Sequence, residues 1–543
     1  MKLFGSLRLR RAAAKQFGWS KLRPAQMTAM RALLAGRDAV VVLPTGAGKS
    51  AIYQVPATLL NGPTLVVSPL IALQQDQIAA LHARTTLRAE AVSSAQTPKQ
   101  QEQALARVRS GEAQLLFVTP EQLASPERLA ELRSLRPALV AVDEAHCISS
   151  WGHDFRPDYL ALGHAIRALG RPPIVALTAT ASPPVREDIA DRLGLRKPAV
   201  VIGGLDRPNL HLEAANCPTE SVRWQRLLAF LSEQDGSGIL YVATRRAAEE
   251  LAERLVAAGR PATFYHGGMA AGARRERHAA FTAGQAPIMV ATSAFGMGID
   301  KSDIRWVVHM ALPDSPDSYL QEIGRAGRDG LPARVLLLHR AEDVGLQRFF
   351  SGGTPAADDL VYVAAAVRAG ITAKSEVAAK TGMSARKVAS LLGLLETIGA
   401  VATGERGGLR LPAYAPMPED AAKLAIAEAE RHQVLQRSRT DMMRRFAEAA
   451  DGCRVRPLLG YFGEQMPGPC GHCDNCGTAP LPPRRRSRAS KPYPLHSQVL
   501  HAEWGRGTVL GYESDRMTVL FDQVGYKTLS TAVVRDNDLL EPA

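Results

Sequence analysis

Short runs of apolar residues recur along the first part of the chain, and each run is followed by polar or helical sequence. This alternation of buried strand and crossover is typical of doubly wound parallel sheets. The runs form two series, which predict two α/β units in tandem. The first series comprises residues 39–42, 64–68, 115–118, 139–142 and 174–178, and the second comprises 239–242, 262–265, 288–292, 306–309 and 335–338.

The pattern changes after position 350. Residues 355–412 read as two short helices around Ser384, followed by a glycine-rich hairpin at 404–408. If Ser384 is the N-cap of the second helix, Arg386 and Lys387 lie in its first turn. This pattern predicts that residues 355–412 form either a winged helix or a helical spacer.

The remainder of the chain predicts a helical stretch at 417–452, an extended basic proline-rich stretch, and then an alternation typical of a small β-barrel of the SH3 or Tudor kind. With 543 residues, several domains are expected. We predict an α/β protein with two doubly wound units, a winged-helix-like segment, a helical metal-binding subdomain, a linker and a β module. The predicted boundaries are 1–204, 205–350, 351–412, 413–479, 480–494 and 495–543.

A glycine-rich loop follows the first apolar run. It reads Pro44-Thr45-Gly46-Ala47-Gly48-Lys49-Ser50. Its glycines allow a tight turn whose N–H groups point at phosphate oxygens beside a helix N-terminus. Lys49 would reach the β and γ phosphates, and Ser50 would bind Mg²⁺. The loop predicts a nucleoside triphosphate site, and the alternative is a turn that binds nothing.

Acidic residues follow the run at 139–142. Asp143 could hold Mg²⁺, and Glu144 could orient and deprotonate the attacking water. Because ligands of such sheets lie at the carboxyl ends of strands, both acids should face the glycine-rich loop. His146 would sense the γ-phosphate or couple the site to nucleic acid. The stretch 17–26 precedes the loop by about twenty residues and can lie over the nucleotide base, where the donor and acceptor of Gln26 suit adenine.

An aromatic loop follows the acidic pair. It contains Trp151, His153, Phe155 and Arg156. Aromatic faces stack on bases and arginine contacts backbone phosphate, so the loop predicts a contact with single-stranded nucleic acid. The alternative is that its aromatic residues fill a domain interface.

The second series of runs contains no second phosphate loop. It carries instead a glycine-rich segment at 321–330, in which Arg325 and Arg328 lie three residues apart. Two arginines so spaced near a helix start can project toward one anion. We therefore expect both to reach the γ-phosphate across a cleft between the units, with surface ion pairing as the alternative.

Four of the six cysteines are clustered, as Cys453, Cys470, Cys473 and Cys476. Four thiolates with this spacing can form a tetrahedral zinc site that joins the surrounding helices. An iron–sulfur cluster is the alternative, because the same spacing opens the bacterial ferredoxin pattern. His472 is the nearby substitute ligand.

The formal net charge of +13 predicts a polyanionic partner, because lysine and arginine that neutralise phosphates release condensed counterions. No apolar run approaches the roughly 18 residues of a membrane span. We expect no membrane contact and a place in the cytoplasm, with the nucleoid. The basic residues 1–17 faintly imitate a presequence, but they predict a first helix that leads into the core.

In order and spacing, these motifs resemble the full set of RecQ-family DNA helicases of superfamily 2. The resemblance is dense over residues 10–345 and returns near 453. The matching positions are Gln26, 44–50, 143–146, the aromatic loop, 178–180, 295–300 and 321–330.

The resemblance implies two RecA-like domains that close on ATP and step 3′-to-5′ along single-stranded DNA, unwinding partial duplexes in repair or recombination. It implies that residues 68–70, 119–121 and 241–245 line the DNA path, and it favours zinc over iron. The winged helix, which would hold duplex DNA, normally follows the zinc site in the family, whereas here it would precede it. The last module, 495–543, is similar to the Tudor-like tail of UvrD-type helicases and would dock a protein or DNA.

Two other functions remain open from the sequence. One is an RNA helicase or a translocase that does not unwind. The other is a nucleic-acid-binding scaffold with an inactive ATP site, against which Lys49, Glu144 and Arg328 argue.

Overall fold

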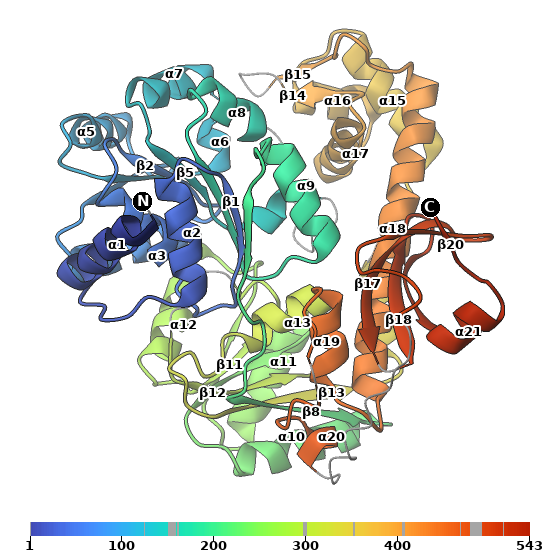
Figure 1. Ribbon diagram of the computed structural model, residues 1–543. Helices are drawn as coiled ribbons and strands as arrows, with labels where there is room; N and C mark the ends of the chain where they lie inside the picture. Colours follow the sequence, from blue (N-terminus) through green and yellow to red (C-terminus); the bar gives the residue numbers. More distant parts are fainter. Residues whose placement is uncertain are drawn as a thin grey trace.

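The computed structural model describes residues 2–543 except for 124, 150–158, 160–161, 297–300, 351–352, 404–407, 467, 478–490 and 514. Two α/β units lie one above the other in Figure 1, with the C-terminal segments along one side of both. None of the described helices combines the length and apolar composition that a membrane crossing requires.

The first α/β unit is built on a seven-stranded parallel sheet. Alternate residues of its strands enter two different cores, because helices cover both faces. Val40 and Val42 belong to one core, and Ala39 and Val41 belong to the other. The strands are β1 Ala39–Val42, β2 Thr64–Val67, β3 Ala89–Val92, β4 Leu115–Val118, β5 Leu139–Val142, β6 Ile174–Thr178 and β7 Ala199–Ile202, in the order β3-β4-β2-β5-β6-β1-β7.

Many helices of this unit begin with proline. The first N–H groups of a helix have no partner within the helix, so the missing N–H of proline costs no hydrogen bond there. Thr97 and Ser125 cap two of them by accepting a backbone N–H. The helices are α1 Lys2–Phe17, α2 Pro24–Leu34, α3 Ala51–Ala57, α4 Ile71–Arg84, α5 Pro98–Arg109, α6 Pro120–Leu123, α7 Pro126–Ser134, α8 Leu162–Ala168 and α9 Pro183–Leu193, with a 3₁₀ turn at Ala145–Ile148.

The second α/β unit has a six-stranded parallel sheet in the order β10-β11-β9-β12-β13-β8. Its strands are β8 Leu210–Asn216, β9 Ser237–Tyr241, β10 Ala262–Tyr265, β11 Ile288–Ala291, β12 Ile304–His309 and β13 Ala333–His339. Its helices are α10 Glu220–Ser232, α11 Arg245–Ala257, α12 Ala271–Thr282, α13 Pro316–Ile323 and α14 Asp343–Phe350. The two sheets confirm the predicted fold class, tandem doubly wound units of the RecA type.

Three helices and a short antiparallel hairpin follow, where the sequence predicts two helices and a hairpin. Ser384 caps the third helix by accepting the N–H of Lys387 at 3.3 Å, as predicted. The predicted turn at 404–408 lies mostly outside the described residues. The elements are α15 Ala357–Arg368, α16 Lys374–Thr381, α17 Ala385–Thr397, β14 Ala402–Thr403 and β15 Leu409–Arg410.

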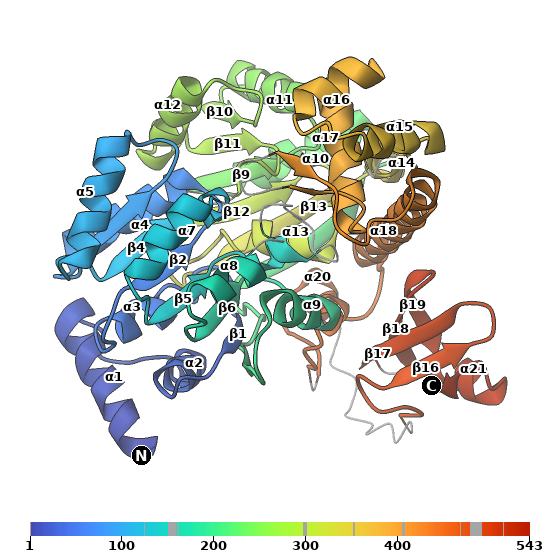
Figure 2. The same cartoon turned by 90° about the horizontal axis from the view of Figure 1, so that it is seen from above.

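A 31-residue helix then runs along the side of both units and leads to the cysteine cluster and the β module. Figure 2 shows the β module at the side of the molecule, beyond this helix. The module is an antiparallel sheet in the order β19-β18-β17-β16-β20, with a small apolar core. The elements are α18 Pro418–Glu448, α19 Val455–Tyr461, α20 Asp474–Gly477, β16 Gln498–His501, β17 Gly505–Glu513, β18 Arg516–Phe521, β19 Gly525–Ser530, α21 Thr531–Asp536 and β20 Glu541–Pro542.

Candidate active site and metal centre

The glycine-rich loop connects β1 to α3 at the carboxyl edge of the first sheet. Gly46 and Gly48 have φ of +79° and +76°, a conformation that residues with a β-carbon rarely adopt. The ammonium of Lys49 donates to the carbonyl of Leu43 at 3.3 Å. Burial lowers the pKa of Lys49, and the neighbouring carboxyl groups offset this only in part.

Gln26 is buried against this loop. Its Nε2 donates to the carbonyls of Ala47 and Gly48 at 3.1 and 3.0 Å, and its Oε1 accepts the N–H of Arg23 at 2.9 Å. The side-chain amide thus fixes the shape of the loop. Its predicted contact with adenine stays a prediction, because both ends of the amide are bonded to protein here.

The two acids follow β5, which β6 separates from β1 in the sheet. Asp143 is buried, and burial together with the charge of Glu144 raises its pKa to about 7. Glu144 has a positive φ of 47°, and its N–H donates to Asp143 Oδ1 at 3.0 Å. Both side chains line the same cavity as Lys49 and Ser50, so the acids face the loop.

A chain of polar contacts leads from Glu144 to the second unit. His146 Nδ1 lies 3.4 Å from a carboxylate oxygen of Glu144 and 2.9 Å from Thr178 Oγ1. The hydroxyl of Thr178 contacts the backbone of Thr180. The hydroxyl of Thr180 accepts Nε2 of Gln321 at 3.3 Å. The acid is thereby connected across the cleft to the helix that precedes the two arginines.

Arg325 and Arg328 follow α13, which Figure 1 shows at the junction of the two units. A β-carbon on Gly46 would lie only 3.3 Å from Cγ of Arg328. Arg325 is 5% exposed, and within the described part of the chain its Nε has no hydrogen-bond partner. A buried guanidinium with an unmet donor suits an anionic ligand.

The loop, the acids and the arginines surround one cavity of about 430 Å³. This volume is in the range of cofactor sites. At its rim, the rings of Phe17 and Trp19 stack with centroids 4.4 Å apart. Both side chains belong to the stretch 17–26, which ends at Gln26.

Arg207 is a residue that the sequence did not single out. Its guanidinium donates to the carbonyl of Thr45 in the loop at 3.4 Å, and to those of Ala326 and Gly327 at 3.0 and 2.8 Å. It therefore joins the phosphate loop to the arginine segment. Its Nε also donates to Oδ1 of Asn209 at 3.3 Å. No local motif marks Arg207, because the three carbonyls lie between 119 and 162 positions away in the chain.

Several predicted DNA contacts lie outside the described residues. These are Trp151, His153, Phe155 and Arg156. Positions 297–300 of the matched segment 295–300 also lie outside the described residues. Of the three predicted strand-end segments, Ser68, Thr119 and Tyr241 are themselves buried. The hydroxyl of Tyr241 donates to the carbonyl of Phe295 at 3.0 Å, which joins the segment 241–245 to the segment 295–300.

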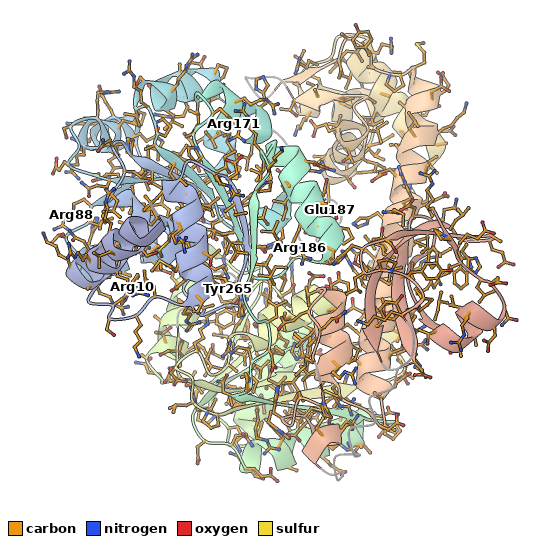
Figure 3. All side chains as sticks on the ribbon, in the orientation of Figure 1. Arg10, Arg88, Arg171, Arg186, Glu187 and Tyr265 are labelled. Atoms are coloured by element: carbon orange, nitrogen blue, oxygen red, sulfur yellow. The ribbon has the colours of Figure 1, made fainter. Side chains whose placement is uncertain are left out.

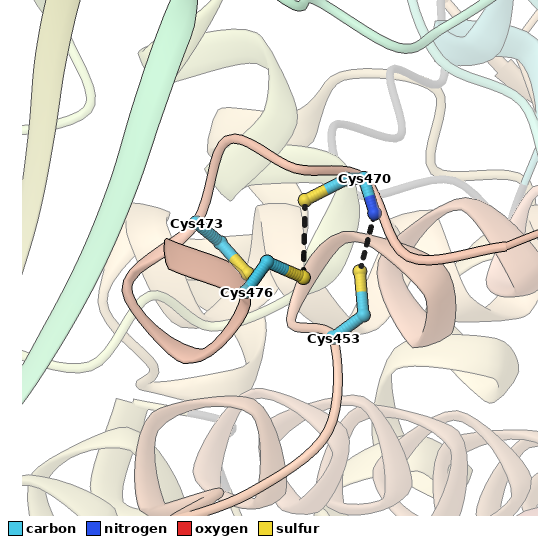
Figure 4. A group of neighbouring side chains, drawn as sticks. All are labelled: Cys453, Cys470, Cys473 and Cys476. Atoms are coloured by element: carbon cyan, nitrogen blue, oxygen red, sulfur yellow. Dashed lines mark hydrogen bonds between the residues drawn. The ribbon is translucent and has the colours of Figure 1, made fainter. Parts of the chain in front are cut away.

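The cysteine cluster forms a compact four-sulfur site (Figure 4). The sulfurs of Cys453, Cys470, Cys473 and Cys476 all lie within 4.8 Å of one another, and those of Cys470 and Cys476 are 3.9 Å apart. Four thiolates around one zinc ion, at Zn–S of about 2.3 Å, require sulfur separations of about 3.8 Å. An iron–sulfur cluster places several iron atoms between its thiolates and needs more space. The site fits zinc.

His472 is not a metal ligand, although the sequence left this open. Its ring nitrogens lie 2.9 Å from the carbonyl of Leu210 and 3.0 Å from a carboxylate oxygen of Asp206. Its backbone carbonyl accepts the N–H of Leu212 at 3.1 Å. The cysteine loop therefore docks on the segment that connects the two sheets.

Comparison with known proteins agrees with this arrangement. Three protein-family profiles match the chain: DEAD/DEAH box helicase over residues 23–189, helicase conserved C-terminal domain over 222–330, and RecQ zinc-binding over 418–477. Among solved structures, helicase Lhr of Mycobacterium smegmatis bound to ssDNA and AMP-PNP has a TM-score of 0.50 at 23% identity, covering 78% of this chain and 61% of that one. The DUF1998 helicase MrfA bound to DNA has a TM-score of 0.52 at 19% identity, covering 76% and 60%. These likenesses concern the fold.

Sequence relatives are closer. The probable ATP-dependent DNA helicase RecS of Bacillus subtilis is 34% identical over 485 residues, which are 89% of this chain and 94% of that protein. ATP-dependent DNA helicase RecQ of B. subtilis is 42% identical over 347 residues, 62% of this chain and 57% of that protein. RecQ of Pasteurella multocida is 42% identical over 328 residues, 60% and 51%. The chain spans little more than half of these two RecQ proteins, and nearly all of RecS. It belongs to the RecQ family of ATP-dependent DNA helicases.

Proposed function

We propose that the protein hydrolyses MgATP between its two α/β units and uses this cycle to move 3′-to-5′ along single-stranded DNA and to separate duplexes. One observation carries the proposal: Arg328 of the second unit packs on Gly46 of the phosphate loop in the first. A nucleotide in this cavity would be held by both units, so its hydrolysis would change how they fit together.

The proposed roles follow from the lining of the cavity. Residues 45–50 cradle the phosphates, with Lys49 on the β and γ oxygens. The hydroxyl of Ser50 and the carboxylate of Asp143 are hard oxygen donors that fit Mg²⁺, which when bound offsets phosphate charge. Glu144 orients and deprotonates the attacking water. Arg325 and Arg328 stabilise the charge that develops on the transferred phosphoryl group.

For the DNA, we propose contacts from the aromatic loop at Trp151, His153, Phe155 and Arg156, with His146 carrying the signal to Glu144. The polar chain from Glu144 to Gln321 supports such coupling. The net charge of +13 and the DNA helicase names of the relatives support DNA as substrate. We also propose the domain boundaries given above, with residues 351–412 as a winged helix that holds duplex DNA. We further propose that the protein acts in DNA repair or recombination in the cytoplasm.

Strand displacement on partial duplexes with a 3′ or a 5′ single-stranded tail tests the proposal. We expect displacement of the 3′-tailed substrate, with ATP only. Glu144→Gln should abolish displacement and lower turnover by about 10³-fold while ATP still binds. Glu187→Gln, on the exposed face of α9, is the matched control and should behave as the unchanged protein. Preferential displacement of the 5′-tailed substrate would contradict the 3′-to-5′ direction. Stronger stimulation of the ATPase by RNA than by DNA would contradict DNA as the substrate.

A further inference from the structure

A buried polar network joins the β module to both α/β units. Its members come from β19, α19, α18, α13 and the start of α9, and all are less than 10% exposed. The hydroxyl of Tyr461 donates to Asp317 Oδ2, and Nε of Arg439 donates to the hydroxyl of Tyr461 at 3.1 Å. The rings of Tyr461 and Tyr526 lie 4.9 Å apart. The hydroxyl of Tyr526 lies 3.4 Å from Oγ of Ser182.

The charge in this network is fully enclosed. Burial opposes the charge of Arg439, but Tyr461, Tyr526 and Asp317 outweigh it and raise its pKa. A buried cation and carboxylate bridged by a tyrosine hydroxyl are costly to separate, because either alone would be left uncompensated. The network therefore fixes the positions of the elements that carry it.

The two ends of the network lie beside the ATP cleft. Asp317 is in the first turn of α13, the helix that leads to Gln321 and then to Arg325 and Arg328. Ser182 is the N-cap of α9, two residues after Thr180, whose hydroxyl accepts Gln321 across the cleft.

A second contact fixes the same arrangement. Arg186 of α9 donates to the carbonyl of Phe462 at 3.0 Å, and Figure 3 shows it at the end of α9 nearest α19. On the other side, Gly525 has φ of +69°, and a β-carbon there would lie 2.5 Å from Oγ of Ser438. The strand that carries Tyr526 thus packs directly on α18.

We propose that Tyr526 of the β module is a positioning residue for ATP hydrolysis. Its ring packs on Tyr461, which together with Arg439 holds Asp317 and so orients α13 with the two arginines toward the phosphate loop. The β module is then part of the motor, in addition to any partner that it docks. This inference rests on the proposed role of Arg325 and Arg328.

DNA-stimulated ATPase of the full-length protein tests the inference. Tyr526→Ala should lower kcat about tenfold and leave the KM for ATP within about twofold, because the arginines act on the transition state and the loop binds the ground state. Tyr526→Phe keeps the ring and should restore most of kcat. Tyr414→Ala, at a side chain that is 99% exposed, is the control for loss of a tyrosine. Stoichiometric binding of a fluorescent ATP analogue shows that each variant is folded.

A double-mutant cycle separates this inference from the proposed function. In an Arg328→Ala background, Tyr526→Ala should add less than twofold, because both act through one interaction. An independent tenfold loss in that background would overturn the positioning role. An unchanged kcat for Tyr526→Ala would do the same. If Arg328→Ala alone hydrolyses ATP at the normal rate, the proposed function is wrong. This single-variant measurement is independent of the result for Tyr526→Ala.

Discussion

Arg207 binds three backbone carbonyls, one in the phosphate loop and two beside Arg328. Burial, together with the nearby charge of Arg23, lowers the pKa of Arg207. A side chain in this position can transmit the state of the loop to the arginine segment without touching nucleotide itself.

Replacing Arg207 with alanine should therefore lower kcat about tenfold and change the KM for ATP much less. Lysine should recover little, because one ammonium cannot reproduce a fork of donors. Steady-state ATPase measurements with saturating single-stranded DNA check this, and Arg275→Ala on the exposed face of α12 is the control. Equal losses in Arg207→Ala and Arg275→Ala would contradict the bridging role.

Among single residues, the sequence indicates those that belong to a local motif of known chemistry. Lys49, Asp143, Glu144 and Arg328 all line the cavity as expected. It could not indicate Arg207, whose partners are backbone atoms far away in the chain. For the same reason the sequence left His472 as a candidate metal ligand, although its ring nitrogens contact Leu210 and Asp206.

The secondary elements were predictable where they are buried on both faces. The runs at β1, β2, β4, β5 and β6 were found to within a residue, because continuous apolar sequence needs two covering layers. The strands that went unpredicted, β3, β7 and β8, lie at sheet edges, where covering is incomplete. Val200 and Ile202 of β7, for example, are exposed.

The cysteine loop is an element whose fold depends on its metal. Cys470→Ser should reduce bound zinc from one ion per chain to a small fraction and lower the apparent unfolding temperature, because the loop loses the ion that closes it. Metal analysis and thermal unfolding check both changes. Cys217→Ala, a buried cysteine of another core, should keep its zinc. A visible absorbance typical of iron–sulfur clusters would contradict zinc.

The packing of the C-terminal segments on the two α/β units could not be predicted from the sequence. Contacts such as that between Tyr461 and Asp317 join residues 144 positions apart. No local periodicity encodes such pairs, because they depend on the surfaces of folded units.

At the scale of the molecule, nucleotide should stabilise the closed arrangement of the two units. A non-hydrolysable ATP analogue with Mg²⁺ at about 100 times its Kd should add about 2.7 kcal/mol to the folded state, seen as a rise in the apparent unfolding temperature. Arg328→Ala should reduce this rise, and Tyr414→Ala should leave it intact. An equal rise in both variants would mean that the nucleotide contacts the first unit alone.

The backbone that connects the two α/β units is anchored on both sides of Gly204. The N–H of Gly203 is still bonded to Val42 of β1, whereas the N–H of Leu205 is already bonded to Glu464 beside the zinc loop. Gly204 alone separates these two anchors. While both bonds hold, any rotation of the first sheet relative to the cysteine loop must change the backbone angles around Gly204.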